Sequence, residues 1–467
     1  MPSVLRGRLA WLCLFAMTLL FSADVARAAT NETETIDLAT ALKLAGAQNI
    51  DVAIAREKLA EAKANYESTL WQFFPWISPG FAYRAHEGRI QNVEGRIIDV
   101  HRDSYALGPT VIAQLELGEA LYKKLAAQQL ATAATHAFEA QRQEALNAAA
   151  LAYFDLARAG AATEVARASI RIADEYSRQV DLAVETGIAF KGDALRTRTQ
   201  LERNQLAFRQ AQEQQRVAAA RLAQILRIPS TTNLTAKADE FVPLILISTG
   251  ASLDALVQRA LAARPELRQS GAVISAATKA SEGARYAPLV PAIGAQAFVG
   301  GLAGGNETSD RGLGESQDYQ VLLGWRIGPG GLFDRSRIRA ADARLRSAQL
   351  SGDKLADEIV RQVVDSYTRV HSATDQLAIV QRGLAAAEET FRLARERKEF
   401  GVGIVLETIQ AEQELTRLRQ DYVATVSDFN KAQFQLLKAI GEAFGPELRN
   451  GAPNLDSPAR EQSKPRQ

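Results

Sequence analysis

The chain has 467 residues, with 55 Lys and Arg against 54 Asp and Glu, a single Cys and 47% hydrophobic residues. Because the charges balance, no basic excess is present to neutralise phosphates, which argues against nucleic-acid binding. One Cys excludes a disulfide framework and a multi-cysteine metal site, and no two of the four His stand at helical ligand spacing. By composition alone, the chain resembles an ordinary water-soluble protein.

The N-terminal segment indicates export. Two arginines precede an apolar run over 9–21, which is too short to span a bilayer. Ala26-Arg27-Ala28 has the small-x-small pattern of a cleavage site, so we expect residues 1–28 to be a signal peptide. An uncleaved anchor is the alternative, which the short run disfavours. The only cysteine, Cys13, would leave with this segment, so no lipid attachment is expected at the N-terminus of the mature chain.

Two copies of one pattern fill the remaining sequence. The segment 38–45, followed by 49–52, has its counterpart at 253–260, followed by 264–267, an offset of 215. Later equivalents keep nearly the same offset, among them Tyr153 and Tyr367, Gly187 and Gly401, and Leu222 and Leu436.

This repetition predicts the organisation of the chain. The expected parts are a first repeat over 29–228, a linker rich in Pro and Thr over 229–250, a second repeat over 251–444 and a polar, mobile tail over 445–467.

Two hydrophobic periods alternate within each repeat. Apolar residues three and four apart over 377–394, and again over 411–439, predict the two arms of an antiparallel helical hairpin. Alternation with a period of two, as over 319–327, predicts strands. In chain order, the expected elements are strands at about 76–86 and 104–117, a helical hairpin at about 120–227, strands at about 292–303 and 318–328, and a second hairpin at about 335–440.

The expected fold is mainly α with a small β part, in two repeats of the order helix-strand-strand-helix-helix. Each strand has one mainly apolar face and one small or polar face, which is typical of outer-membrane barrel strands. A half-buried sheet of a soluble protein is the alternative. Four strands close no barrel in one chain, and open edges are not tolerated in lipid, whereas three copies would supply twelve strands.

Smaller features have structural explanations. Arg264-Pro265 predicts an interruption of a helix, because Pro lacks the backbone donor. Asp334 is expected to cap the long helix that follows it. The Gly-rich stretch over 300–314 is expected to connect two strands outside the cell.

These features resemble one family over nearly the whole expected mature chain, the outer membrane factors, which are the TolC-like exit ducts of efflux pumps and type I secretion systems. The segments that carry the resemblance are 253–267, Pro329-Gly330-Gly331-Leu332-Phe333-Asp334-Arg335, and Phe400-Gly401-x-Gly403 before Glu407. The resemblance implies a homotrimer with a twelve-stranded β-barrel in the outer membrane, continued by a coiled-coil α-barrel across the periplasm.

The resemblance also implies what such a protein does. It would conduct substrates passively from the periplasm, or from a tripartite pump, to the outside; it would be no enzyme and would hold no cofactor or metal. Its implied partners are a periplasmic adaptor protein, an inner-membrane transporter driven by protons or ATP, and the lipid of the outer membrane.

A short acidic segment near the hairpin turns lines the closed aperture in this family. The matching positions are Asp193 in the first repeat and Glu407 and Gln410 in the second. The match departs from the family pattern, because Gln410 is neutral and Gly403 and Lys398 stand where an Arg and a Tyr are expected.

The acidic ring is therefore expected to be weaker, and the latch between hairpins to differ. Lys398 or Arg196 is a candidate to pair with Glu407 or Asp193. The alternative is that these charges only solvate an exposed helical turn. Four glycines, Gly187, Gly192, Gly401 and Gly403, are expected to form the turns at the hairpin tips, where adaptors dock in this family.

Two other classes of protein are alternatives to the duct. A periplasmic coiled-coil adaptor or scaffold would share the signal peptide and the hairpins, but it needs a lipoyl-like β-module at the hairpin base and lacks this duplication. A periplasmic enzyme is the third class, and no Ser-His-Asp, His-cluster or phosphate-loop arrangement is visible in the sequence.

Overall fold

The computed structural model describes residues 33–237, 239, 241–248, 250–305, 312–400 and 403–442. The expected signal peptide over 1–28 and the expected tail over 445–467 lie outside these residues, as do 306–311 of the Gly-rich connection and Gly401.

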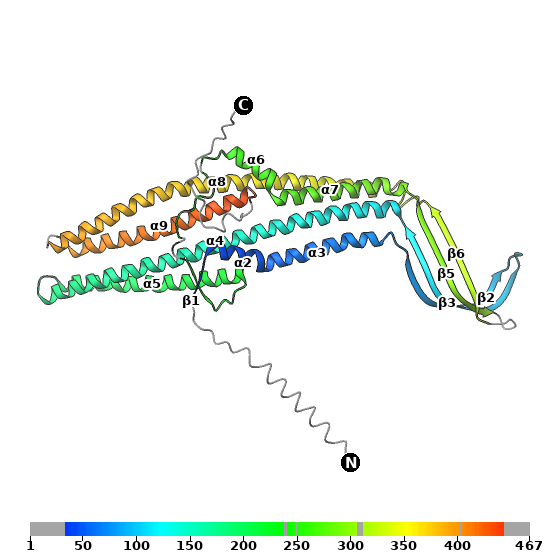
Figure 1. Ribbon diagram of the computed structural model, residues 1–467, viewed down its shortest axis with the longest axis horizontal. Coiled ribbons are helices and arrows are strands. Elements are labelled where there is room, and N and C mark those ends of the chain that lie inside the picture. Colours follow the sequence, from blue (N-terminus) through cyan, green and yellow to red (C-terminus); the bar gives the residue numbers. More distant parts are fainter. Residues whose placement is uncertain are drawn as a thin grey trace, which may run out of the picture.

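The molecule is a long layer of helices that carries a β-sheet at one end and two hairpin tips at the other (Figure 1). Two helices, α4 (Leu117–Glu185) and α8 (Arg335–Glu399), run through both halves of this layer. The 69 residues of α4 include no Pro, so nothing interrupts a helix of about 100 Å. None of the described helices combines the length and hydrophobicity that crossing a membrane requires.

Shorter helices flank these two on either side of the middle. Toward the sheet the neighbours follow in the order α3-α4-α7-α8, and toward the tips in the order α5-α4-α9-α8. In each half, therefore, one flank of the layer belongs to α8 and the other to α3 or α5. The bounds of the remaining helices are α2 Leu38–Gln48, α3 Ile50–Trp71, α5 Lys191–Leu226, α6 Leu253–Ala263, α7 Pro265–Tyr286 and α9 Val405–Ala439.

The two repeats are visible in equivalent hydrogen bonds. The Asn49 side chain, between α2 and α3, donates to the Ile225 carbonyl at 3.2 Å. At the equivalent point between α6 and α7, Arg264 donates to the Ala439 carbonyl at 3.3 Å. Arg264 is 4% exposed and also holds Glu266 through two bonds, at 2.8 and 3.0 Å. The predicted interruption at Arg264-Pro265 is confirmed. In each repeat, the polar residue that precedes α3 or α7 is hydrogen-bonded to the C-terminal end of α5 or α9.

Two apolar clusters lie near the middle of the layer. The first gathers Tyr153, Phe154 and Leu222 from α4 and α5 against α2, and the second gathers Ile359 and Leu436 from α8 and α9 against α6. A short parallel pair, β1 (Thr33–Ile36) with β4 (Asn233–Ala236), joins the described N-terminal end to the linker.

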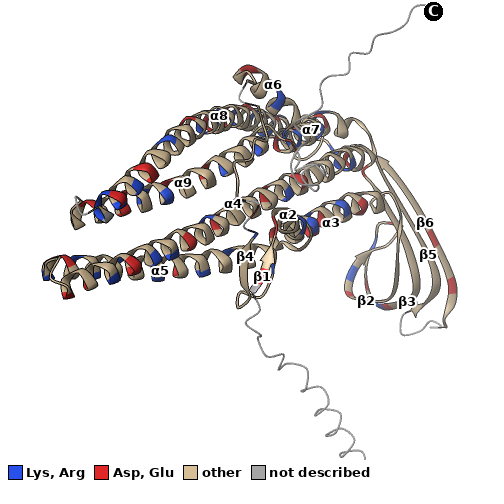
Figure 2. Cartoon of the chain, turned by 60° about the vertical axis from the view of Figure 1, so that its left-hand side comes forward, with Lys and Arg blue, Asp and Glu red and all other residues tan. Residues whose placement is uncertain are grey.

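The four long strands form one antiparallel sheet in the order β2-β3-β5-β6. Both outer strands, β2 and β6, are edges within the described chain. Charged residues are spread along the helices, whereas β5 carries none (Figure 2). The strand bounds are β2 Trp76–Gln91, β3 Ile97–Leu115, β5 Ala292–Gly305 and β6 Gly314–Gly324.

The first two strands differ from the expected ones in length. The first strand extends to Gln91 and the second begins at Ile97. The turn between them contains Gly95, whose φ is 85°, and the Arg96 amide donates to Asn92 Oδ1 there at 2.8 Å. The stretch over 86–101 mixes polar and aliphatic residues without a sustained period-two pattern. The second strand was expected to reach 117, but it ends at Leu115 because α4 begins at Leu117.

The last strand was expected over 318–328, which is wrong at both ends. It begins at Gly314 and ends at Gly324. Beyond it the chain bends at Gly328 and Gly330, whose φ angles of 105° and 76° are left-handed. The Asp334 side chain then accepts from the Arg337 amide at 3.0 Å, so the predicted cap of α8 is confirmed.

Candidate functional site at the hairpin tips

The tip of the first hairpin is a tight turn between α4 and α5. Gly187 has a left-handed φ of 75°, and the Ile188 amide donates to the Ala183 carbonyl at 2.8 Å. Together with the bond from the Gly187 amide to the Val184 carbonyl at 3.0 Å, this is a Schellman ending of α4. Gly187 therefore lies in the turn, in a left-handed conformation that glycine adopts without strain.

The tip of the second hairpin lies between α8 and α9. The Gly403 amide donates to the Arg397 carbonyl at 2.9 Å, which folds the start of α9 back onto the end of α8. A Cβ atom at Gly403 would lie 2.9 Å from the Lys398 amide nitrogen, so the approach of the two backbones requires glycine. Gly401, the equivalent of Gly187, lies outside the described residues.

Gly192 was expected in the turn, and this is wrong. It lies in the first turn of α5, which begins at Lys191, and a Cβ atom there would meet nothing within 4 Å. The turn closes before it, because the left-handed residue at Gly187 already reverses the chain.

The acidic residues occupy equivalent places at the two tips. Asp193 and Glu407 each lie in the first turn of their helix, α5 and α9, where the helix dipole favours a negative charge. Gln410 follows Glu407 by three residues and is exposed. The two carboxylates belong to different hairpins, and the described chain does not bring them into contact with each other.

Each carboxylate has an arginine partner. Arg196 Nη1 donates to Asp193 Oδ1 at 3.2 Å, as expected for one candidate pair. Glu407 was expected to pair with Lys398 or Arg196, but Arg397 Nη1 donates to its Oε1 at 2.8 Å. Lys398 is rotated by about 100° from Arg397 on the helix, and the arginine reaches across the turn that Gly403 allows. Both pairs join residues within one hairpin, so neither is a latch between hairpins.

Exposed apolar side chains at the tips were missed by the sequence reasoning. Phe190 and Ile404 precede α5 and α9 at equivalent positions and are 83% and 65% exposed. Helices usually begin with a polar capping side chain, worth about 1 kcal/mol, yet neither residue makes a side-chain capping bond among the described residues. Ile188 and Phe400 beside them are also more than four-fifths exposed. The missed signal was the apolar residue at a helix start where Ser, Thr, Asp or Asn is normal.

The described residues offer no group of three or more His, Cys, Asp or Glu placed to hold a metal ion. Each tip therefore presents one paired acidic residue beside exposed apolar side chains. This arrangement is suited to contact with ions and with another protein.

Known proteins match most of the chain. The family model described as "Outer membrane efflux protein" matches residues 41–226 and 256–442, one segment in each repeat. Protein CyaE of Bordetella pertussis is 28% identical over 339 residues, which cover 70% of this chain and 68% of CyaE.

Solved structures share the fold. The outer membrane protein VceC of Vibrio cholerae matches with a TM-score of 0.72 at 16% identity, over 87% of this chain and 97% of VceC. CusC, whose structures concern folding and transmembrane channel formation, matches with a TM-score of 0.71 at 20% identity, over 90% of this chain and 96% of CusC.

Substitution by alanine should have different effects on proteolysis at Gly403 and at Gly192. Gly403→Ala places a Cβ atom 2.9 Å from backbone, so the second turn must shift and limited proteolysis should cut there faster than in the wild type. Gly192→Ala meets open space inside a helix and should leave the cleavage rate unchanged or lower it, since Ala favours helix by about 1 kcal/mol. Equal cleavage rates for both variants would contradict the tight approach at Gly403.

Proposed function

The chain belongs to the outer membrane efflux protein family, and on that premise we propose that three copies form a continuous duct that conducts substrates passively from the periplasm to the outside. As a member of this family, the protein is an outer-membrane channel. The observation that carries the proposal is a sheet with two open edges at one end of a helical layer whose other end carries the pore-lining candidates.

The surfaces that the chain leaves without a neighbour support assembly with further copies. The sheet exposes the edges β2 and β6, and the helical layer near the sheet ends in α3 on one flank and α8 on the other. Pairing β6 with β2 of the next copy also places α8 beside α3 of that copy. Twelve strands would then close without an edge.

Exposed side chains of opposite charge occur on these two flanks. Arg339 and Arg346 of α8 and Glu61 and Glu67 of α3 are exposed, and among the described residues they have no ion-pair partner within the chain. Counted from the sheet ends of the helices, Glu67 and Arg339 both lie at about 6 Å, whereas Glu61 lies at about 15 Å and Arg346 at about 17 Å. We propose that these residues face each other across the boundary between copies.

The aperture of the duct is proposed to lie at the hairpin tips, lined by Asp193, Glu407 and Gln410. A ring of carboxylates at a constriction favours cations, but here the arginine partners of Asp193 and Glu407 compensate much of that charge. The proposed aperture is therefore nearly neutral, and its selectivity depends on the balance of the two pairs.

The tips are also proposed as the docking surface for a periplasmic adaptor, which connects the duct to an inner-membrane transporter. Phe190 and Ile404, with Ile188 and Phe400, supply an exposed apolar surface at the far end from the sheet. Apolar side chains that replace helix caps weaken the free protein, and contact with a partner accounts for their presence. Export by a cleaved signal peptide over 1–28, without lipid attachment, completes the proposal.

The proposed aperture can be tested by changing one charge of a pair. Glu407→Gln leaves Arg397 uncompensated in each copy, so the reversal potential of purified channels in planar bilayers should shift toward anion preference. Arg397→Gln should shift it toward cations, and the double variant should return it close to the wild type. If the charges only solvate the turn, all three variants will show the wild-type potential.

The docking surface can be tested by Phe190→Ser combined with Ile404→Ser. Each side chain is exposed, so folding should be unaffected, and loss of two interface anchors at about 2 kcal/mol each should weaken binding by several hundredfold. The measurement is the yield of the cross-link between the channel and its native adaptor in host membranes. Val242→Ser, an exposed apolar residue of the linker, is the control. An unchanged cross-link in the double variant would contradict docking at the tips.

A further inference from the structure

A carboxylate is buried between the two hairpins, a short distance from the tips. Glu412, on α9, is 4% exposed. Its Oε1 accepts from Asn204 Nδ2 and its Oε2 from Gln200 Nε2, each at 3.1 Å. Since Gln200 and Asn204 lie on α5, this one side chain joins the hairpin of the second repeat to the hairpin of the first.

Further hydrogen bonds extend this junction. Gln413 donates to Gln200 Oε1 at 2.6 Å, and Asn204 also donates to the Ser169 carbonyl at 3.2 Å. The hydroxyls of Ser169 and Thr416 are 2.8 Å apart. Side chains of α4, α5 and α9 therefore form one polar cluster around Glu412.

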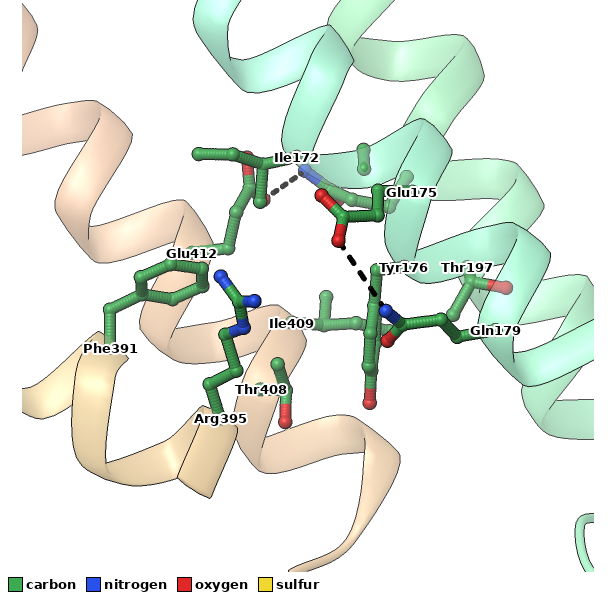
Figure 3. Close-up of a pocket in the computed structure, with 12 residues that line it drawn as sticks. Ile172, Glu175, Tyr176, Gln179, Thr197, Phe391, Arg395, Thr408, Ile409 and Glu412 are labelled. Carbon is green, nitrogen blue, oxygen red and sulfur yellow. Dashed lines mark hydrogen bonds between the residues drawn. The ribbon is translucent and has the colours of Figure 1, made fainter. Parts of the chain in front are cut away.

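The cluster adjoins a small cavity between the hairpins (Figure 3). Its volume of about 50 Å³ is enough for a few water molecules. The titratable and charged groups that line it besides Glu412 are Glu175 and Tyr176 of α4 and Arg395 of α8. On α5 and α9 the residues around the carboxylate, Gln200, Asn204 and Thr416, are neutral.

The environment disfavours the ionised form of Glu412. Burial raises the pKa of its carboxyl above the ordinary 4.5, and the hydrogen bonds from Asn204, Thr416 and Gln200 oppose this rise without cancelling it. Burial likewise raises the pKa of Tyr176 above its ordinary value, which is already well above physiological pH, so its hydroxyl adds no charge beside Glu412. If the hairpins separate, water reaches Glu412 and the pKa of its carboxyl returns toward the ordinary value.

We propose that Glu412 is a proton-binding site that couples the contact between the two hairpins to periplasmic pH, so that proton uptake holds the hairpins together and proton release favours their separation. The site itself stands on the buried junction, while its effect on conduction rests on the proposed aperture at the tips.

The direction of the pH effect on the contact between the hairpins follows from the linkage between proton binding and packing. A carboxyl whose pKa is raised in the packed state binds its proton more tightly there than in the separated state. Its stabilisation of the packed state is fully present below pH 4.5 and is lost as the pH rises through the raised pKa. Acid therefore tightens the junction and neutral pH loosens it.

This site occurs in one repeat only. The residue equivalent to Glu412 in the first repeat is Arg198, which is exposed on α5. A trimer would therefore hold three such sites, each at the junction between the two hairpins of one chain.

The test begins with the full-length trimer in detergent, whose unfolding temperature is measured from pH 4 to pH 8. Glu412→Gln removes the titrating group, so the variant should lose the pH dependence of the unfolding temperature. The matched control is Glu414→Gln, an exposed carboxylate two residues away, which should follow the wild-type profile.

A second variant keeps the test independent of overall stability. Asn204→Leu removes a donor to the ionised carboxylate and should move the midpoint of the pH profile upward, whatever its effect on the unfolding temperature. Parallel profiles for the wild type and Glu412→Gln, or an unmoved midpoint in Asn204→Leu, would overturn the proton site.

Conductance then tests the coupling to the aperture. In planar bilayers, wild-type channels should open less often as the pH of the tip side falls, and Glu412→Gln should open rarely at every pH. The wild type and Glu412→Gln could differ in the pH dependence of stability and still open equally often. That result would overturn the coupling to the aperture but would not contradict the proposed duct. Absence of any conductance in the wild type would instead contradict the proposed function.

Discussion

Open strand edges are the constraint on which the rest of this structure depends. The sheet β2-β3-β5-β6 has two unpaired edges, and backbone groups without partners are too costly to place in lipid. Only pairing of β6 with β2 of another copy satisfies both edges with the same contact. In the proposed trimer, that pairing would bring α8 of one copy beside α3 of the next, with the hairpin tips at the end far from the sheet.

Duplication gave the chain equivalent positions, and the two repeats use them for different chemistry. Asn49 and Arg264 both tie a helix to the end of a hairpin, but only the arginine also holds a carboxylate. Asp193 pairs within its own helix, whereas Glu407 pairs across a turn. Such differences distinguish the two hairpins of one chain, so a trimer would have two kinds of hairpin at its tip.

The long helices and the repeat could be predicted because their signals are local and recur along the sequence. The strand ends were harder to predict, because the stretch over 86–101 mixes polar and aliphatic residues without a sustained period-two pattern. Among the described residues, it pairs only within the β2-β3 hairpin. The partner of Glu407 depended on the path of a turn that a glycine permits. Glu412 looks like an ordinary surface residue in the sequence, and its burial comes from a hairpin more than two hundred residues away.

Cross-linking across the boundary between copies tests the central claim most directly. The chain's only cysteine, Cys13, lies in the expected signal peptide, so the background for engineered cysteines is clean. Within one chain α4 and α7 separate α3 from α8, so a disulfide between Glu61→Cys and Arg346→Cys must join two copies. Oxidised outer membranes should yield a covalent trimer without reductant, and Glu61→Cys with Arg361→Cys, about 22 Å further along α8, should not. Monomer alone from the first pair, or equal trimer from both pairs, would contradict the proposed duct.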